Sequence, residues 1–133
     1  MNTNTTIPLS SYITGNNIDM MGYAWHSVPG FSDIGYYVGN NSTDGPALHF
    51  GFKPAWLMIT KVGNGSGNGS KWHIFDNARD PVNNATQYAL YGDVPTGDGV
   101  GSAASTAHVH FTANGFKIIN NPSGGINQAD VYI

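Results

Sequence analysis

The sequence predicts an all-β fold, an antiparallel β-sandwich of jelly-roll-like type with about eight or nine strands. Residues that fill exposed helix faces are scarce, because the 133 residues include five Lys and Arg and no Glu. Turn-forming residues are abundant, with 18 Gly beside many Asn, Ser and Thr. The apolar runs are short, rich in aromatic and β-branched residues, and separated by turn signals.

The chain has the length of one domain. We expect a polar, Asn/Thr-rich N-terminal arm over residues 1–19, with a short strand around Leu9–Ile13, and the sandwich over residues 20–133. The expected strands of the sandwich are Met20–His26, Ile34–Val38, Ala47–Phe50, Ala55–Lys61, Lys71–Asp76, Gln87–Tyr91, Thr106–Thr112, Gly115–Ile119 and Asp130–Ile133.

Two connections predict hairpins. Asn114-Gly115 lies between two apolar runs, and both residues tolerate the positive φ of a tight turn. The Gly-rich stretch 62–70 joins two strong strands and predicts a long exposed tip.

Alternation sorts the side chains of two expected strands. Trp72 and Ile74 share one side of their strand, and His73 and Phe75 share the other. The run Ala55–Lys61 is apolar on both sides, which predicts either a central place in the sandwich or contact with a partner subunit.

Several classes of function are disfavoured. Without Cys there are no disulfides and no thiolate metal sites. A net charge of -3 without a basic cluster argues against nucleic acid binding. No apolar run approaches the roughly 20 residues that span a bilayer, so we expect no membrane insertion. Residues 1–6 lack the basic and apolar regions of a signal peptide. If the protein leaves a cell, it does so by another route, such as attachment to a particle.

Two groups of residues are weak candidates for metal binding. His108 and His110 form an H-x-H pattern in an expected strand, so both imidazoles point the same way, but no third ligand is signalled nearby. The alternative is a polar outward or interfacial face. Asp93 and Asp98 lie on a Gly-rich stretch that suits calcium, although their spacing does not match the EF-hand pattern and turn chemistry explains them more simply. We expect no cofactor.

Asp76, Arg79 and Asp80 form the one candidate for acid–base chemistry. Because the only Arg of the chain lies between the two carboxylates, we interpret the group as a structural ion pair that locks a loop. No Ser lies in a nucleophile-elbow context. We therefore predict that the chain is not an enzyme and has no catalytic residues.

Aromatic residues are candidates for stacking on sugars of a glycan receptor. The main ones are Tyr36, Tyr37, Tyr88 and Tyr91, with Trp25 beside them. Packing in the core or at an interface is the alternative for each, and since Tyr36 and Tyr37 are adjacent, one of them must point away from the core. Glycosylation triplets begin at Asn4, Asn40, Asn41, Asn64, Asn68 and Asn84, but the composition makes them expected by chance.

Six segments follow one another in a distinctive order. They are Gly22–Ser32, Gly35–Asn40, Asp44–Pro46, Gly51–Ile59, Trp72–Pro81 and Ala113–Lys117. In this order they resemble a repeat domain of large structural proteins of marine phages, and the likeness covers roughly residues 20–133. The resemblance implies structural roles: Pro54 and Pro81 set loops, Asn114 and Gly115 make a turn, and Trp56 and Trp72 fill the core.

The resemblance also implies a function. It indicates a module of a tail fibre, spike or other appendage on the virion surface, which assembles with other virion proteins. We also expect homo-oligomers, with trimers favoured. The module is expected to contact the host surface, where a glycan is a possible receptor. In the family the closing strand runs on past Val131–Ile133, so we expect an unpaired edge that a neighbouring subunit completes unless the chain is a fragment of a longer protein. A capsid decoration or cement protein of the same virion is the first alternative. A free carbohydrate-binding β-sandwich is the second, and a glycosidase the least favoured.

Overall fold

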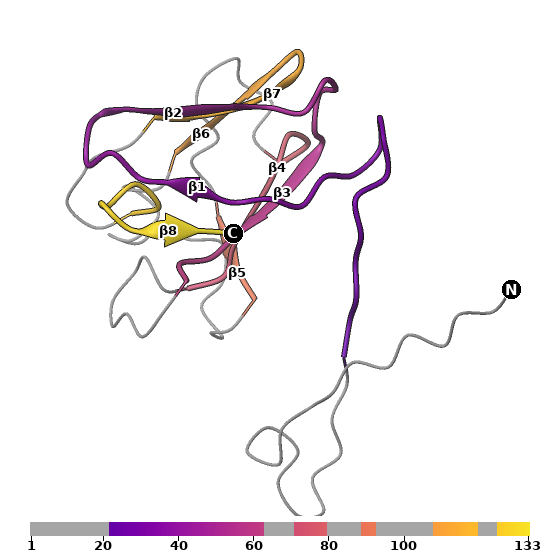
Figure 1. The fold of residues 1–133 in the computed structure, drawn as a ribbon, viewed down its shortest axis with the longest axis horizontal. Helices are drawn as coiled ribbons and strands as arrows, with labels where there is room; N and C mark the ends of the chain where they lie inside the picture. The colour runs from indigo at the N-terminus through magenta and orange to yellow at the C-terminus, as the bar shows by residue number, and fades with distance from the viewer. Residues whose placement is uncertain (1–21, 63–70, 80–88, 93–107, 120–124) are drawn as a thin grey trace, which may run out of the picture.

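The computed structural model describes residues 22–62, 71–79, 89–92, 108–119 and 125–133, which are drawn in colour in Figure 1. Every regular element in these ranges is a β-strand and every strand pair is antiparallel, so the predicted all-β sandwich is confirmed. The same ranges contain no helix that is long and apolar enough to cross a membrane.

Eight strands make up the described part of the sandwich, and each overlaps a strand expected from the sequence. Their bounds are β1 (Tyr37–Val38), β2 (Asp44–His49), β3 (Trp56–Ile59), β4 (His73–Asp76), β5 (Leu90–Tyr91), β6 (Val109–Thr112), β7 (Gly115–Ile119) and β8 (Val131–Tyr132). The expected strand Met20–His26 is wrong in its described part, because residues 22–26 are in no strand. They lie away from the sandwich, where no neighbouring strand can pair with their backbone (Figure 1).

The strands form two layers. One is the three-stranded sheet β2-β7-β6. The other begins as the sheet β3-β4-β5, and hydrogen bonds between residues 60–62 and 131–133 join it to the pair β1-β8. Thr60 and Ile133 exchange both backbone hydrogen bonds, at 2.8 and 2.9 Å, which places the strands in the order β1-β8-β3-β4-β5.

The winding is jelly-roll-like because the first two strands run against the last two. β1 pairs with β8 in one layer, and β2 pairs with β7 in the other. The unpaired edge expected at Val131–Ile133 is a wrong prediction. β8 has β1 on one side and residues 60–62 on the other, because the chain brings its own strands to both.

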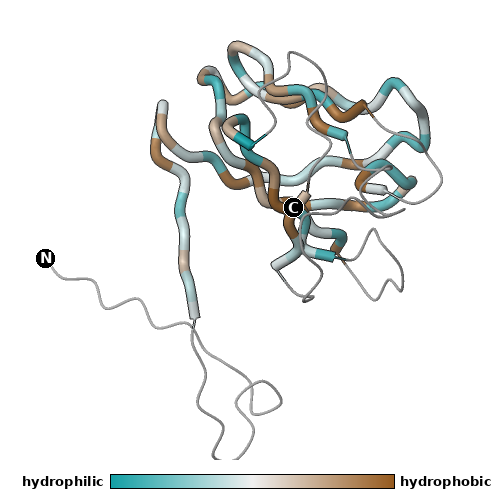
Figure 2. The backbone as a smooth tube through the Cα atoms, turned by 180° about the vertical axis from the view of Figure 1, so that it is seen from behind, coloured by the Kyte–Doolittle hydropathy of each residue, from teal (hydrophilic) through white to brown (hydrophobic). Residues whose placement is uncertain are grey.

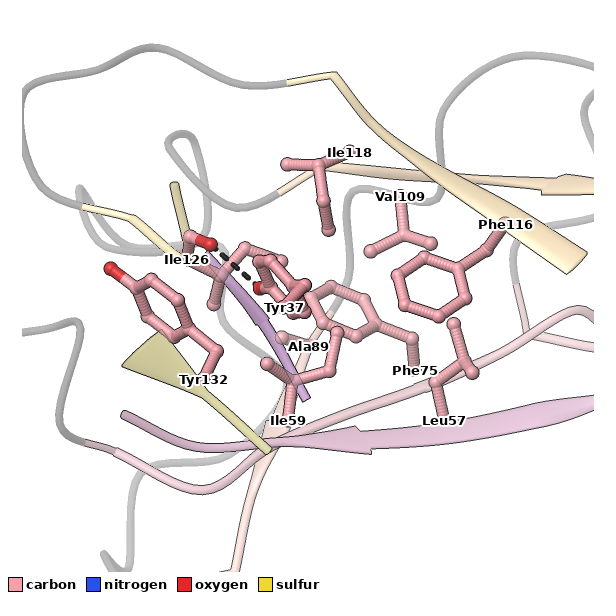
Figure 3. Close-up of a cluster of buried hydrophobic side chains, with 10 residues drawn as sticks. All are labelled: Tyr37, Leu57, Ile59, Phe75, Ala89, Val109, Phe116, Ile118, Ile126 and Tyr132. Carbon is pink, nitrogen blue, oxygen red and sulfur yellow. Dashed lines mark hydrogen bonds between the residues drawn. The ribbon is translucent and has the colours of Figure 1, made fainter. Parts of the chain in front are cut away.

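The core lies between the two layers (Figure 3). Val109, Phe116 and Ile118 of one layer face Leu57, Ile59, Phe75 and Tyr132 of the other. Each such side chain contributes roughly 1.5–3 kcal/mol when fully buried. Since they come from five of the eight strands and from both layers, the two layers depend on each other.

The β6–β7 hairpin confirms the predicted turn but not the predicted reason for it. Thr112 pairs with Gly115, so the two loop residues are Ala113 and Asn114, and the positive φ expected at Asn114 and Gly115 is absent. Gly115 is instead the first residue of β7, where a Cβ atom would overlap the carbonyl oxygen of Leu48 in β2. Glycine is therefore required for the close approach of two strands.

A buried asparagine locks the loop after β1 to the turn before β8. Asn127 is fully buried, and its Nδ2 donates to the Asn40 side-chain oxygen at 2.8 Å and to the Ser42 carbonyl at 2.6 Å. Its Oδ1 accepts from the Asn40 backbone N–H at 3.0 Å. Removing these partners would leave the buried amide unsatisfied and would cost about 1–3 kcal/mol of folding stability. These hydrogen bonds therefore stabilise the contact between the loop after β1 and the turn before β8.

Candidate functional site

The Asp76 carboxylate is engaged by its own turn. Its Oδ1 accepts from the backbone N–H groups of Ala78 at 3.1 Å and Arg79 at 2.8 Å, and its Oδ2 accepts from Arg79 Nε in an ion pair. The Arg79 guanidinium also donates to the Ile74 carbonyl at 3.4 Å. This is the ion-pair arrangement that the sequence predicts for Asp76 and Arg79, whereas Asp80 lies outside the described residues.

The same contacts set the charge of Asp76. Desolvation on its own would raise the pKa, but the hydrogen bonds from Arg79 and Ala78 outweigh it and hold the pKa below the ordinary value of an aspartate. The carboxylate is thus charged near neutral pH. A proton donor for glycoside hydrolysis needs the opposite shift.

His108 and His110 lie on the three-stranded layer. His110 is exposed on β6 directly opposite Lys117 of β7, and His108 is half-buried just before β6. A lysine ammonium beside His110 disfavours a second cation at that position. The described residues contain no group of three or more metal-ligating side chains, and Asp93 and Asp98 lie outside them.

The four tyrosine candidates fall into different places. Tyr36 is 72% exposed at the end of the segment before β1. Tyr37 is a core residue, so its expected role in sugar contact is wrong: it stacks on Tyr132 with ring centroids 5.1 Å apart and donates to the Ile126 carbonyl at 2.7 Å (Figure 3). Alternation forces this division, since adjacent residues point to opposite sides. Burial raises the pKa of Tyr37 well above its ordinary value.

Tyr91 has little free ring surface. It lies on the inner side of β5, where Lys71 Nζ is 4.7 Å from its ring centroid and the His73 ring meets it edge-on at 5.1 Å. Tyr88 lies outside the described residues.

Glycosylation at Asn40 would disrupt the hydrogen bond that its Nδ2 donates to the Asp44 carbonyl at 2.8 Å.

Trp56 and Trp72 do not fill the core, contrary to the prediction. They are 50% and 42% exposed. The pairing of β3 with β4 sets Leu57 against Phe75 on the inner side, which leaves the alternate residues of both strands outside. The division of side chains along β4 was predicted correctly, since His73 and Phe75 are buried.

The outward side chains of the five-stranded layer, apart from Asp76 and the buried Thr60, form one surface, which we call the apolar face. A row of Met58, Ile74 and Leu90 crosses β3, β4 and β5 at its centre. Val38 lies opposite Val131 at the β1-β8 end. The apolar face consists of Val38, Trp56, Met58, Val62, Trp72, Ile74, Leu90, Val131 and Ile133, of which only Met58 and Ile74 are half-buried and the rest are exposed.

A second apolar surface precedes β1. We call residues 22–36 the lead-in segment; all are exposed except Ser32, which is half-buried. The segment stands apart from the sandwich in both views (Figures 1 and 2). Its large side chains are Tyr23, Trp25, Val28, Phe31, Ile34 and Tyr36, and the first two stack with ring centroids 6.0 Å apart.

The lead-in segment nevertheless has a defined local structure. Phe31 N–H donates to the Val28 carbonyl at 2.9 Å, with Pro29 and Gly30 between them and a φ of 76° at Gly30. These are the features of a type II turn. Ser32 Oγ donates to the His26 carbonyl and Ile34 N–H donates to Ser27 Oγ, so the two arms of the turn are held together.

Sequence reasoning missed two of these features. The Pro29-Gly30 pair is a turn signal that could have identified the tip of the lead-in segment. For Asn127, nothing in Gly125-Ile126-Asn127-Gln128 separates it from the many other asparagines, because its partners lie near residue 40.

Comparison with known proteins gives one result. A family model with the description "Domain of unknown function (DUF7483)" matches residues 1–133. Searches of curated proteins and of solved structures gave no match.

Proposed function

The chain belongs to the family described as Domain of unknown function (DUF7483), and we propose that it is a structural assembly module of a virion surface, in a tail fibre, spike or similar appendage. The observation that carries the assembly role is the apolar face. Seven of its nine side chains are exposed, and soluble monomers rarely leave a large contiguous apolar patch in water. A patch of this kind marks a surface that another protein covers.

The virion location is supported by the ordered motifs that resemble phage structural repeats. Of these motifs, Gly22–Ser32 lies in the lead-in segment, while Gly51–Ile59 and the described part of Trp72–Pro81 supply β3, β4 and the centre of the apolar face. These three motifs thus supply residues of the two exposed apolar surfaces.

Immunogold labelling of purified particles from a virus that encodes the chain tests this proposal. We expect label on a tail appendage. Label spread over the capsid shell would favour the decoration protein instead. Particles from which mass spectrometry recovers no trace of the chain would contradict both locations.

Carbohydrate binding is a second candidate, favoured by the stacked and exposed Tyr23–Trp25 pair. An aromatic platform of this kind covers the apolar side of a sugar ring. A glycan array with the whole chain, followed by titration of any hit, tests it. Trp25→Ala should abolish such binding, whereas Trp56→Ala, the same change on the sandwich, should preserve it. A blank array at millimolar glycan would remove this candidate.

A further inference from the structure

The lead-in segment and the apolar face have complementary properties. The segment is a projecting turn with Phe31 at its tip, 81% exposed. The apolar face is a broad sheet surface, and Gly92, which has no side chain, lies beside Trp72 and Ile74. A Cβ atom built on Gly92 would lie 3.6 Å from Trp72 and 3.7 Å from Ile74. An aromatic side chain from outside can take the position that a larger residue at 92 would occupy.

We propose that the lead-in segment of one copy packs against the apolar face of a second copy. This inference rests on the proposed assembly role and names its partner as another copy of the same chain. The two surfaces are different parts of one molecule, so the contact is head-to-tail. A head-to-tail contact closes into a ring if the rotation allows it and otherwise extends into a filament.

The size of the segment suits such a contact. Its four aromatic side chains each offer roughly 150–250 Å², most of it exposed, which amounts to about 550 Å² before Val28 and Ile34 are counted. A stable interface buries about 800 Å² on each partner. The preformed turn also lowers the entropy cost of docking, since the hydrogen bonds around Ser27 and Ser32 already fix its shape.

The charges of both surfaces are compatible with burial. Asp33 is the only Asp, Glu, Lys or Arg among residues 22–36, and its carboxylate accepts from Ser27 Oγ at 3.0 Å. The charge beside the apolar face is Asp76, which is paired with Arg79. Covering these surfaces therefore removes few bare charges from water, and burial of bare charges is what makes association costly.

Cross-linking of the whole chain tests the contact directly, because the chain contains no Cys. Phe31→Cys and Trp72→Cys are prepared as separate proteins, mixed, and treated with a short bis-maleimide. We expect a dimeric product that contains one chain of each kind. Phe31→Cys mixed with His110→Cys, an exposed residue of the opposite layer, is the matched control and should give little of this product.

Other occupants of the apolar face give other products, and each would overturn the proposal. Trp72→Cys alone giving dimers would mean that two apolar faces stack on each other. Phe31→Cys alone giving dimers would mean that two segments pair. A double variant that cross-links within one chain, while the mixture does not, would place the segment on its own sandwich.

The oligomeric state supplies an independent measurement. Light scattering should find a concentration-dependent oligomer, and Phe31→Ser should raise its dissociation constant by roughly 30-fold or more while the melting temperature of the dilute protein stays unchanged. A strictly monomeric wild-type chain would overturn the exchange of segments. Particles that still carry immunogold label would then leave the proposed virion role standing, so the two failures can be told apart.

Discussion

The two outer faces of the sandwich differ in chemistry although both belong to antiparallel strands with the same alternation. The outer side of β2-β7-β6 presents His49, Ala47, Lys117, His110 and Thr112, and Lys117 forms an ion pair with Asp44. The outer side of the other layer is the apolar face, where Asp76 lies opposite Trp56. One face follows the pattern of a solvated sheet and the other does not.

This difference teaches how an interaction surface can be recognised from the outward side chains of a sheet. Both layers contribute apolar side chains to the same core, so the demands of folding are met on the inner side of each. The outer apolar residues are therefore not needed to fill this core. Their occurrence on one layer alone is the pattern from which we propose that a partner covers that side.

The largest effect should separate the inner and outer sides of one strand. Phe75→Ala removes a fully buried ring from the core, and we expect a loss of about 3–5 kcal/mol in the free energy of unfolding. Ile74→Ala, its half-buried neighbour on the apolar face, should cost about 1 kcal/mol. Urea titrations of the dilute protein measure both. Equal losses would mean that the apolar face is part of the monomer core.

The next effect concerns how the polar-faced layer is held together. Gly115→Ala places a Cβ atom against the Leu48 carbonyl oxygen and should destabilise the chain by about 1–3 kcal/mol as β2 and β7 separate. Gly35→Ala is the control, because nothing lies within 4 Å of a Cβ atom there. Its effect on thermal unfolding should be within about 0.5 kcal/mol. A neutral Gly115→Ala would mean that the two strands can shift apart freely.

A smaller effect, dependent on pH, is expected at the charged edge of the apolar face. The pKa of Asp76 is lowered in the folded state, so its contribution is present above the ordinary aspartate pKa and is lost as pH falls through the lowered value. Because the side chain is partly exposed, we expect less than about 1 kcal/mol. Unfolding of Asp76→Asn followed between neutral and acid pH should lack this component. An unchanged pH profile would show that the ion pair adds nothing.

The smallest change in stability should accompany a large change in association. Trp56→Ser combined with Leu90→Ser makes the apolar face polar, and we expect the free energy of unfolding to change by no more than about 0.5 kcal/mol per site. Sedimentation should show that the oligomer dissociates. The matched change His110→Ser on the opposite layer should leave the oligomer intact. Loss of the oligomer only in His110→Ser would reverse the assignment of the two faces.

Much of the fold could be predicted from the sequence, because short apolar runs and turn residues are local signals. They located eight strands and the β6–β7 hairpin. The side chains that share a side were also predictable, as Trp72 with Ile74 shows. Which side faces inward was not, because β3 is apolar on both sides and alternation does not tell the two apart.

The remainder depends on contacts between distant residues. The place of Asn127 follows from partners near residue 40, and the need for glycine at 115 follows from Leu48 in β2. The pairing of β8 on both sides depends on residues 60–62 and β1 together. No local pattern carries this information, so the apolar face could be seen only after the strands were paired.

The pairing of β1 with β8 has a consequence for how the protein is made. β1 is made before the other described strands of the sandwich, yet the strand that it pairs with, at Val131–Tyr132, follows almost the whole sandwich. Closure of this layer therefore has to wait until the rest of the sandwich has been made, and contacts between such distant segments form slowly. During the wait the nascent chain exposes its aromatic residues, so we expect chaperones to hold it until the sheet has closed.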